Sequence, residues 1–431
     1  AWFDDTTTFE GAAFRDRAVF LRSRFDHDAC FADATFAAPT TFRGSEFHGG
    51  EHAVDDADFQ GATFAATADF KRVEFRYARF DGVHVAADLG FAESVFTGTA
   101  RFEGVAVDGE TTFSGAVFEQ EALFADAAFA GPAAFDRIRF DDDTSFAGVR
   151  FAGTANFKAT EFRGKTNHEN DDATFEEATF GGDAAFAQAR FEFANFSGVT
   201  VHGAANFQDV RFRELGAFDR ATFHDEVTFE RARFQFATFD GVTFAAPADF
   251  KHVRFVERLT MRASSAAGMQ AVDMSHAVLA GGRITQPAED PAVYDLTGAT
   301  LGEVRLAGDR RDLFDEFRFC NTTFDDFDFT RHKESLARND WVIHEWVAAE
   351  SSRFPDVEPV TDPATLESTY LKAKNGAADF GDRKAASEFF IKEMTYRRRK
   401  NAAIAFRADG DADGAVDALD RLTAAGKWVG N

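Results

Sequence analysis

The sequence predicts a mainly β protein, a parallel solenoid whose four-sided coils hold about 22 residues, followed by a small helical region. Three observations predict it. Phe recurs with a step that alternates between five and six residues, and the residue two positions before each Phe is small. Beyond about residue 330 this period ends and apolar pairs at i,i+4 spacing replace it.

The Phe run is longest in the middle of the chain, where Val takes the slot twice, at Val85 and Val107. The chain holds 55 Phe but only four Tyr and four Trp, so one structural slot is being refilled in every repeat. The Phe residues of the run are Phe80, Phe91, Phe96, Phe102, Phe113, Phe118, Phe124, Phe129, Phe135, Phe140, Phe146, Phe151, Phe157 and Phe162.

The small residue of each repeat indicates extended backbone. Ala116 precedes Phe118 by two positions, and residues two apart on a strand share a face, so both should point inward. A helix with 3.6 residues per turn would scatter this pattern around its cylinder. Stacked coils must hold a whole number of 11-residue repeats, and an 11-residue coil has little room for two Phe rings. We therefore expect coils of about 22 residues with four faces.

The segment Phe113-Ser-Gly-Ala-Val-Phe118-Glu-Gln-Glu-Ala-Leu-Phe124 resembles the Phe-rich variant of the pentapeptide-repeat family. The resemblance implies a right-handed quadrilateral β-helix that serves as a scaffold. We assign residues 1–255 to this Phe-type β-helix and 256–329 to an irregular Leu/Phe continuation. Residues 330–406 are assigned to a helical capping or coupling domain, and 407–431 to an acidic linker and short helix.

Two interruptions break the Phe period. Between Phe47 and Phe59 one slot is skipped, and the step of thirteen residues from Phe162 to Phe175 predicts a bulged loop. After Phe255 the apolar slot holds Met and Leu, and five-residue steps of Leu and Phe return only near residue 296. The solenoid is expected to resume or end there.

Four helices are expected in the C-terminal hundred residues, and the last is the short helix within 407–431, over Ala415 to Ala425. The pair Val342 and Trp346 predicts the first, and Asp362 followed by Pro363 is typical of the start of the second. The third is expected over 382–406. One role for these helices is to cover the open strand edges and Phe rings at the end of the solenoid.

A second role comes from another resemblance. Leu366-Glu-Ser-Thr-Tyr370-Leu-Lys, with Lys384 to Arg399, resembles the linker of archaeal and bacterial pentapeptide-repeat proteins that continue into a two-helix, potassium-channel-like pore. This implies a cytoplasmic region of an ion channel, homo-oligomeric, with a membrane pore segment beyond residue 431. The basic cluster in this linker would then face anionic lipid, or else it is a solvated helix end favoured by the macrodipole. Its residues are Arg397, Arg398, Arg399 and Lys400.

The net charge of −26, with only 11 Lys among 47 basic residues, favours a halophile in which carboxylates hold water and salt at the surface. We expect a cytoplasmic location, at the inner face of the cell membrane. Two alternatives remain open: a soluble protein-interaction scaffold or DNA mimic that acts on gyrase, and a surface structural protein. The acidity disfavours direct nucleic-acid binding, so the expected partners are proteins or further subunits of this chain.

One motif suggests a cation. Carboxylates at calcium-loop spacing follow the third helix, with Gly414 at the sixth position, although the last of them is Asp where Glu is usual. The residues are Asp409, Asp411, Asp413, Asp417 and Asp420. The other interpretation is a flexible acidic linker. We find no nucleophile, phosphate-loop or dinucleotide motif, so we expect no enzyme activity and no cofactor other than calcium.

Overall fold

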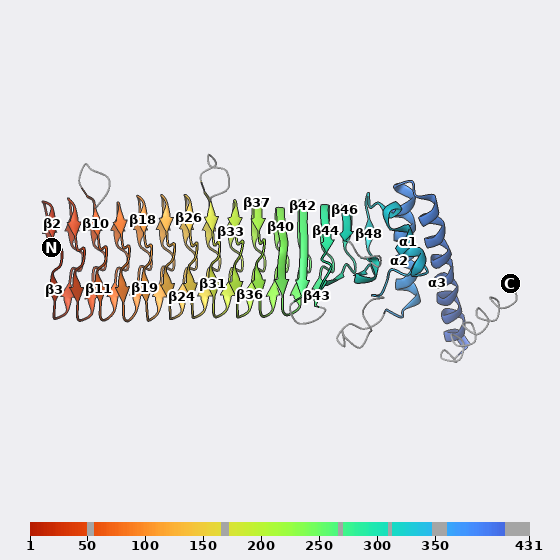
Figure 1. The fold of residues 1–431 in the computed structure, drawn as a ribbon, viewed down its shortest axis with the longest axis horizontal. Coiled ribbons are helices and arrows are strands. Elements are labelled where there is room, and N and C mark those ends of the chain that lie inside the picture. Colours follow the sequence, from red (N-terminus) through yellow and green to blue (C-terminus); the bar gives the residue numbers. More distant parts are fainter. Residues whose placement is uncertain (50–55, 165–171, 266–269, 309–312, 347–359, 410–431) are drawn as a thin grey trace.

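The computed structural model describes residues 1–49, 56–164, 172–265, 270–308, 313–346 and 360–409. It is a parallel β-solenoid of about 14 coils with about 22 residues per turn, followed by helices at the C-terminal end (Figure 1). The predicted fold class is confirmed. Each regular coil contributes four short strands, and each strand pairs in parallel with its equivalents in the coils before and after it.

The four resulting ladders are the four faces of the solenoid. The first ladder contains β1 (Trp2–Phe3), β5 (Arg24–Phe25), β9 (Glu46–Phe47), β13 (Glu74–Phe75), β17 (Val95–Phe96), β21 (Val117–Phe118), β25 (Arg139–Phe140), β29 (Glu161–Phe162), β33 (Arg190–Phe191), β37 (Arg211–Ala217), β40 (Arg233–Phe244), β42 (Arg254–Ser265), β44 (Val278–Gln286), β46 (Thr300–Gly308) and β48 (Thr323–Phe324).

The second ladder contains β2 (Thr7–Thr8), β6 (Ala29–Cys30), β10 (Ala57–Asp58), β14 (Ala78–Arg79), β18 (Ala100–Arg101), β22 (Ala122–Leu123), β26 (Thr144–Ser145), β30 (Ala173–Thr174) and β34 (Ala194–Asn195). The third contains β3 (Ala13–Phe14), β7 (Thr35–Phe36), β11 (Thr63–Phe64), β15 (His84–Val85), β19 (Ala106–Val107), β23 (Ala128–Phe129), β27 (Arg150–Phe151), β31 (Thr179–Phe180), β35 (Thr200–Val201) and β38 (Thr222–Phe223). Both then continue in the long strands that begin with β37 and β40.

The fourth ladder is a separate 14-stranded sheet. It contains β4 (Ala18–Val19), β8 (Thr40–Thr41), β12 (Ala68–Asp69), β16 (Leu89–Gly90), β20 (Thr111–Thr112), β24 (Ala133–Ala134), β28 (Ala155–Asn156), β32 (Ala184–Ala185), β36 (Ala205–Asn206), β39 (Val227–Thr228), β41 (Ala248–Asp249), β43 (Ala271–Asp273), β45 (Val293–Asp295) and β47 (Phe317–Arg318).

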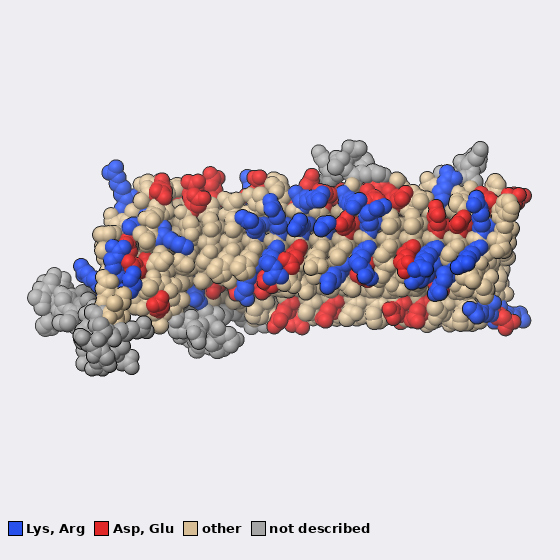
Figure 2. Space-filling model, turned by 180° about the vertical axis from the view of Figure 1, so that it is seen from behind, with Lys and Arg blue, Asp and Glu red and all other residues tan. Residues whose placement is uncertain are grey.

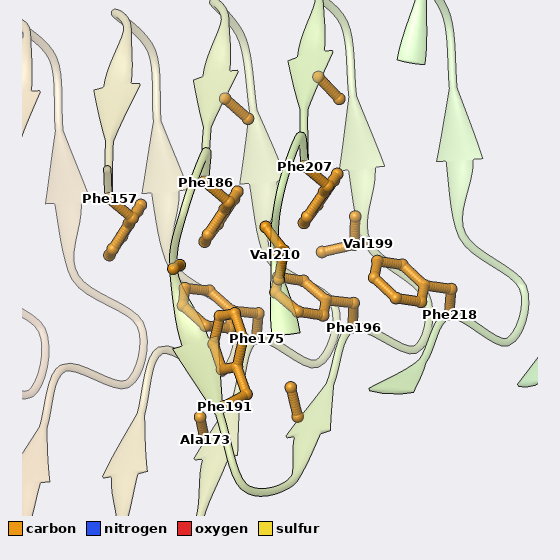
Figure 3. Close-up of a cluster of buried hydrophobic side chains, with 14 of the residues drawn as sticks. Phe157, Ala173, Phe175, Phe186, Phe191, Phe196, Val199, Phe207, Val210 and Phe218 are labelled. Carbon is orange, nitrogen blue, oxygen red and sulfur yellow. The ribbon is translucent and has the colours of Figure 1, made fainter. Parts of the chain in front are cut away.

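Phe fills the solenoid because its ring stacks at the spacing of the strands. Phe157, Phe186 and Phe207 form one column with ring centroids 4.8 and 4.9 Å apart, close to the ~4.8 Å between neighbouring strands. Phe175 and Phe196 belong to a neighbouring column that meets the first edge to face, at 5.3 Å (Figure 3). The small residue of each repeat also lies inside, so large and small side chains alternate across the core.

Both interruptions of the Phe period are insertions at one corner. Ala29 pairs with Ala57, and Thr144 pairs with Ala173, so these coils are longer than 22 residues while the ladders stay in register. The first insertion separates β9 from β10 and the second separates β29 from β30. The prediction of a skipped slot was therefore wrong, because Phe47 and Phe59 occupy consecutive slots that extra residues separate.

The solenoid continues past Phe255, although the pairing of β42 with β44 has a register shift between Phe255 and Leu259. Phe255, Leu279, Leu301 and Phe324 are successive partners in the first ladder. Two 3-10 turns accompany the last coil: η1 (Leu313–Glu316) lies between β46 and β47, and η2 (Phe329–His332) follows β48. Leu and Met keep the slot apolar here, so the stacking of coils survives the loss of Phe.

The helices are α1 (Lys333–Arg338), α2 (Pro363–Asp379) and α3 (Arg383–Asp409). Asp362 caps α2 by accepting from the backbone N–H groups of Ala364 and Thr365, as predicted. The prediction of a helix around Val342 was wrong, because residues 341–346 are not helical. Trp341 adopts a positive φ of 57°, which ends the preceding helical turn.

Helices α2 and α3 form a hairpin that covers the C-terminal end of the solenoid (Figure 1). Gly376 of α2 lies so close to Phe324 of β48 that an added Cβ would be 2.7 Å from the Phe324 carbonyl oxygen. Phe389 of α3 packs edge to face on Phe329 and Trp341, at 5.1 and 5.4 Å between ring centroids. We call residues 313–346 and 360–409 the helical cap.

Candidate functional site

A large hollow lies where the solenoid meets the helical cap. This junction groove, of about 1340 Å³, runs from β42, β44 and β46 to η2 and α1. Six basic residues line it, and Glu334 is the one acidic residue among its described walls. The basic residues are Arg262, Arg283, Arg305, Arg331, Lys333 and Arg338. This positive lining stands out in a chain with a net charge of −26.

Three of these cations are held by carboxylates. Arg262 Nε lies 3.1 Å from Asp240, Arg331 Nε lies 2.9 Å from Asp328, and Lys333 Nζ lies 3.1 Å from Asp382. These pairs fix the side chains of the groove walls and neutralise part of their charge.

Two cations are not paired in this way. Arg283 and Arg305 are register partners on β44 and β46, so they stand side by side at one strand spacing. Both are exposed, and neither makes an ion pair with any residue that the structure describes. Like charges placed opposite one another on neighbouring strands repel, and a bound anion would relieve this repulsion.

Two buried side chains in the lining of the groove are uncharged. Gln286 is buried and its side-chain amide nitrogen donates to the Ala292 carbonyl oxygen over 2.8 Å. His332 is buried against Phe314 and Phe327, and burial lowers the pKa of its imidazole to about 4, so the ring is neutral at physiological pH. The positive charge of the groove therefore comes from its Arg and Lys side chains and not from His332.

The basic cluster expected at the membrane is partly engaged within the cap. Arg397 donates to Glu367 over 2.7 Å and to Glu393 over 2.5 Å, and Lys400 also binds Glu367. Hydrogen bonds first from Lys400 and then from Arg397 lower the pKa of the Glu367 carboxyl. Arg399 lies over the ring of Tyr396. These contacts hold α3 against α2 and leave Arg398 as the member without a described pair.

The predicted calcium loop lies almost entirely outside the described residues. Asp409 is the last residue of α3, and Asp411, Asp413, Asp417 and Asp420 follow it beyond the described part. Within the described ranges, no group of three or more His, Cys, Asp or Glu side chains is arranged to hold a metal ion. The predicted Phe run, in contrast, is buried throughout.

The family model of pentapeptide repeats (9 copies) matches residues 91–138, 170–211 and 207–254. These segments carry the Phe period and lie within the regular coils of the solenoid. No curated protein and no solved structure matches the chain significantly. Among the residues described, no helix is long and apolar enough to cross a membrane.

Sequence reasoning missed the junction groove. Arg262, Arg283 and Arg305 stand 21 or 22 positions apart, and this coil-length spacing was the available signal. The cap side of the groove had no such signal, because its residues reach the solenoid only through the packing of η2 and α1.

Proposed function

We propose that the chain is a non-catalytic interaction scaffold that binds an acidic segment of a protein partner in the junction groove. The pentapeptide-repeat solenoid supports the scaffold role, since its interior is filled by stacked rings and its exterior is a regular set of flat faces. The observation that carries the partner assignment is the couple Arg283 and Arg305, which line the basic groove side by side without an ion-pair partner among the described residues.

The size of the groove favours a segment of polypeptide over a small molecule. Small-molecule sites usually enclose about 300–1,000 Å³ and are mostly apolar, whereas this groove is larger, open and polar. An extended acidic segment can place carboxylates along such a groove, where Arg guanidinium groups bind them in a bidentate manner.

A labelled oligoglutamate peptide tests the proposal by fluorescence polarisation at low and high salt. We expect binding at low salt, and an affinity loss of about tenfold or more for the double variant Arg283→Glu, Arg305→Glu. The matched control reverses two exposed arginines of the first coil, Arg15→Glu with Arg17→Glu, and should keep the affinity. Equal losses of peptide affinity in both variants would show that the peptide responds only to the overall charge of the chain. The assignment of the binding site to the junction groove would then be wrong.

The finer proposal is that this scaffold is the cytoplasmic region of a membrane protein such as an ion channel. The linker resemblance in α2 and α3 supports it, and these helices form the hairpin at the C-terminal end of the solenoid (Figure 1). Fractionation of the product of the complete gene tests it. Recovery of that product only in the soluble fraction after ultracentrifugation would contradict it.

Mimicry of DNA receives less support from the surface. On the face shown in Figure 2, Lys and Arg side chains lie in rows among Asp and Glu, whereas a duplex presents unbroken negative charge. A gyrase supercoiling assay with the purified chain separates the two functions, and inhibition of supercoiling would favour mimicry over the scaffold proposed here.

A further inference from the structure

One outward position of the first ladder changes character along the solenoid. It lies directly before the inward Phe of each coil, and it holds Arg139, Glu161, Arg190, Arg211, Arg233 and Arg254 in successive coils. Arg and Glu alternate at first, and then four Arg follow one another in register. We call Arg211, Arg233 and Arg254 the arginine comb.

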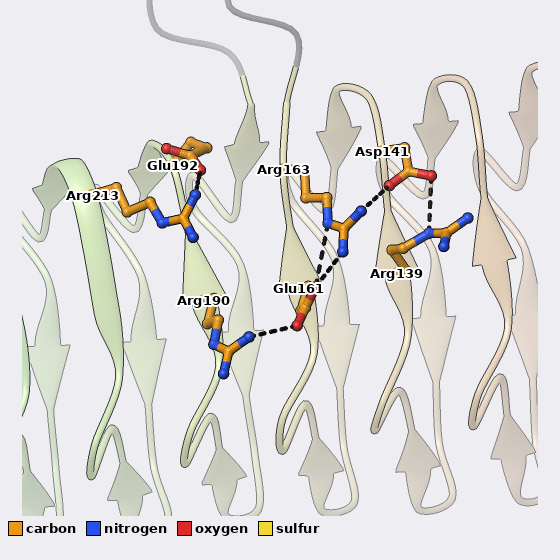
Figure 4. Close-up of polar contacts among 7 residues, drawn as sticks. All are labelled: Arg139, Asp141, Glu161, Arg163, Arg190, Glu192 and Arg213. Atoms are coloured by element: carbon orange, nitrogen blue, oxygen red, sulfur yellow. Dashed lines mark hydrogen bonds and ion pairs between the residues drawn. The ribbon is translucent and has the colours of Figure 1, made fainter.

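The coils before the comb show how such a position is normally compensated. Arg139 pairs with Asp141 at 2.9 Å, and Glu161 accepts from Arg163 at 2.7 Å and from Arg190 at 2.8 Å (Figure 4). Charges of opposite sign therefore meet along and across the strands, and no outward Arg of this group depends on solvent alone.

The comb lacks this compensation. The guanidinium groups of Arg211, Arg233 and Arg254 form no ion pair or hydrogen bond with any residue in the described ranges, and all three side chains are exposed. The nearest carboxylates are committed to other partners. The pKa of Asp209 is lowered chiefly by its hydrogen bonds with Arg231, at 2.9 Å, and only secondarily by the charge of Arg211.

The neighbours of the comb form a shallow cleft of about 520 Å³ around it. Arg213 is bound by Glu192 at 2.5 Å, and Gln235 donates to Glu257 at 3.1 Å, so the flanking side chains are held in place. His252 lies at the same cleft. The three residues of the comb are register partners on β37, β40 and β42, with strand spacings of ~4.8 Å between their backbones.

We propose that the comb binds a short chain of linked phosphates, such as tripolyphosphate or the phosphate tail of a nucleoside triphosphate. Guanidinium groups form bidentate hydrogen bonds with phosphate oxygens, and a chain of phosphates presents several negative charges in line with the row. The volume of the cleft suits a small anion, in contrast to the larger junction groove. The repulsion between the stacked Arg side chains is relieved when such an anion bridges them.

Calorimetric titration of the full chain with tripolyphosphate tests this proposal, with inorganic phosphate at equal ionic strength as the reference anion. We expect tripolyphosphate to bind at least about tenfold more tightly than phosphate, and Arg233→Gln to remove about tenfold or more of that affinity. The matched control Arg163→Gln changes an exposed Arg on the same face whose charge is already compensated, and it should bind as the wild type does.

Further titrations distinguish a nucleotide from a free phosphate chain as the ligand, and the arginine comb from the junction groove as the site. Tighter binding of ATP than of tripolyphosphate would identify a nucleotide as the natural source, and equal binding would identify the phosphate chain itself. The variant Arg283→Glu, Arg305→Glu should bind tripolyphosphate unchanged, since those residues belong to the junction groove.

Three results would overturn the proposal: unchanged affinity in Arg233→Gln, phosphate binding as tight as tripolyphosphate, or a loss confined to the junction-groove variant. Tighter binding of single-stranded DNA than of tripolyphosphate through the same arginines would also overturn it, in favour of a nucleic-acid surface.

Discussion

Truncation of one ring in the middle of the Phe column gives the most direct test of the core. Phe124 is fully buried, with its ring stacked on Phe102 at 4.8 Å and on Phe146 at 4.7 Å. Its edges meet Phe113 at 5.4 Å and Phe135 at 5.6 Å. The variant Phe124→Ala removes all of these contacts and leaves a ring-sized cavity between coils that are fixed in register by their backbone hydrogen bonds.

The expected cost follows from this geometry. Phe to Ala changes in protein cores cost about 3–5 kcal/mol, and the cost is higher where the surroundings cannot collapse into the cavity. Collapse is restricted here because the neighbouring rings are carried by strands that pair in register with the coils before and after them. Aromatic pairs add about 0.5–1.5 kcal/mol each beyond the buried area. We therefore expect a loss of about 3–5 kcal/mol in the free energy of unfolding.

Guanidinium chloride unfolding of the full chain measures this loss, and hydrogen exchange shows where it falls. The second measurement matters because stability in a repeat protein is a sum of coil and interface contributions, so the coils around Phe124 can open locally. Phe236→Ala is the matched control, since the Phe236 side chain is 45% exposed. Its expected loss is below about 1 kcal/mol. A loss for Phe124→Ala below about 1 kcal/mol, or no larger than that of the control, would refute the assignment of the ring to the core.

Three further outcomes are expected. Gly376→Ala should destabilise the cap by about 1–3 kcal/mol despite the higher helix propensity of Ala, because the new Cβ meets Phe324; a rise in melting temperature would contradict this. Burial lowers the pKa of His344 from its ordinary value of 6.5 to about 4 in the folded chain. As the pH falls, His344 is therefore protonated in the unfolded chain before it is protonated in the folded chain. Stability should fall as the pH drops from 6.5 towards 4, and His344→Gln should weaken this fall in a Trp fluorescence titration. Arg233→Gln should raise the melting temperature at low salt and leave it unchanged at high salt, because it breaks a row of like charges; calorimetry at both salt concentrations checks this.

The regular part of the fold could be predicted because the same residue types occupy the same inward positions in every coil. Phe96, Phe118 and Phe140 are register partners, and their 22-residue spacing is visible in the sequence. The continuation beyond Phe255 was harder to see, since Leu279 and Leu301 fill the Phe slot with a different apolar side chain. Apolar identity, rather than Phe itself, is what the slot requires.

The sites were less predictable, for two physical reasons. The arginine comb leaves a signal, an Arg directly before the inward Phe in successive coils. Its meaning depends on which carboxylates lie nearby, and these come both from the same coil and from neighbouring coils. The junction groove depends on the packing of η2 and α1 against the strands. The helix expected at Val342 failed for a related reason, because the fixed position of Trp341 against Phe389 outweighs the local i,i+4 pattern.

The two insertions lie at a fixed distance from each other along the solenoid axis. The first insertion follows β9 and the second follows β29, and five coil steps of the first ladder separate these two strands. At ~4.8 Å per step the two insertion points lie about 24 Å apart along the axis. A stack of backbone-bonded coils holds this distance constant. A partner that contacts both insertion points must have two binding elements that match this distance. Once the first contact has formed, the second forms at a high effective concentration.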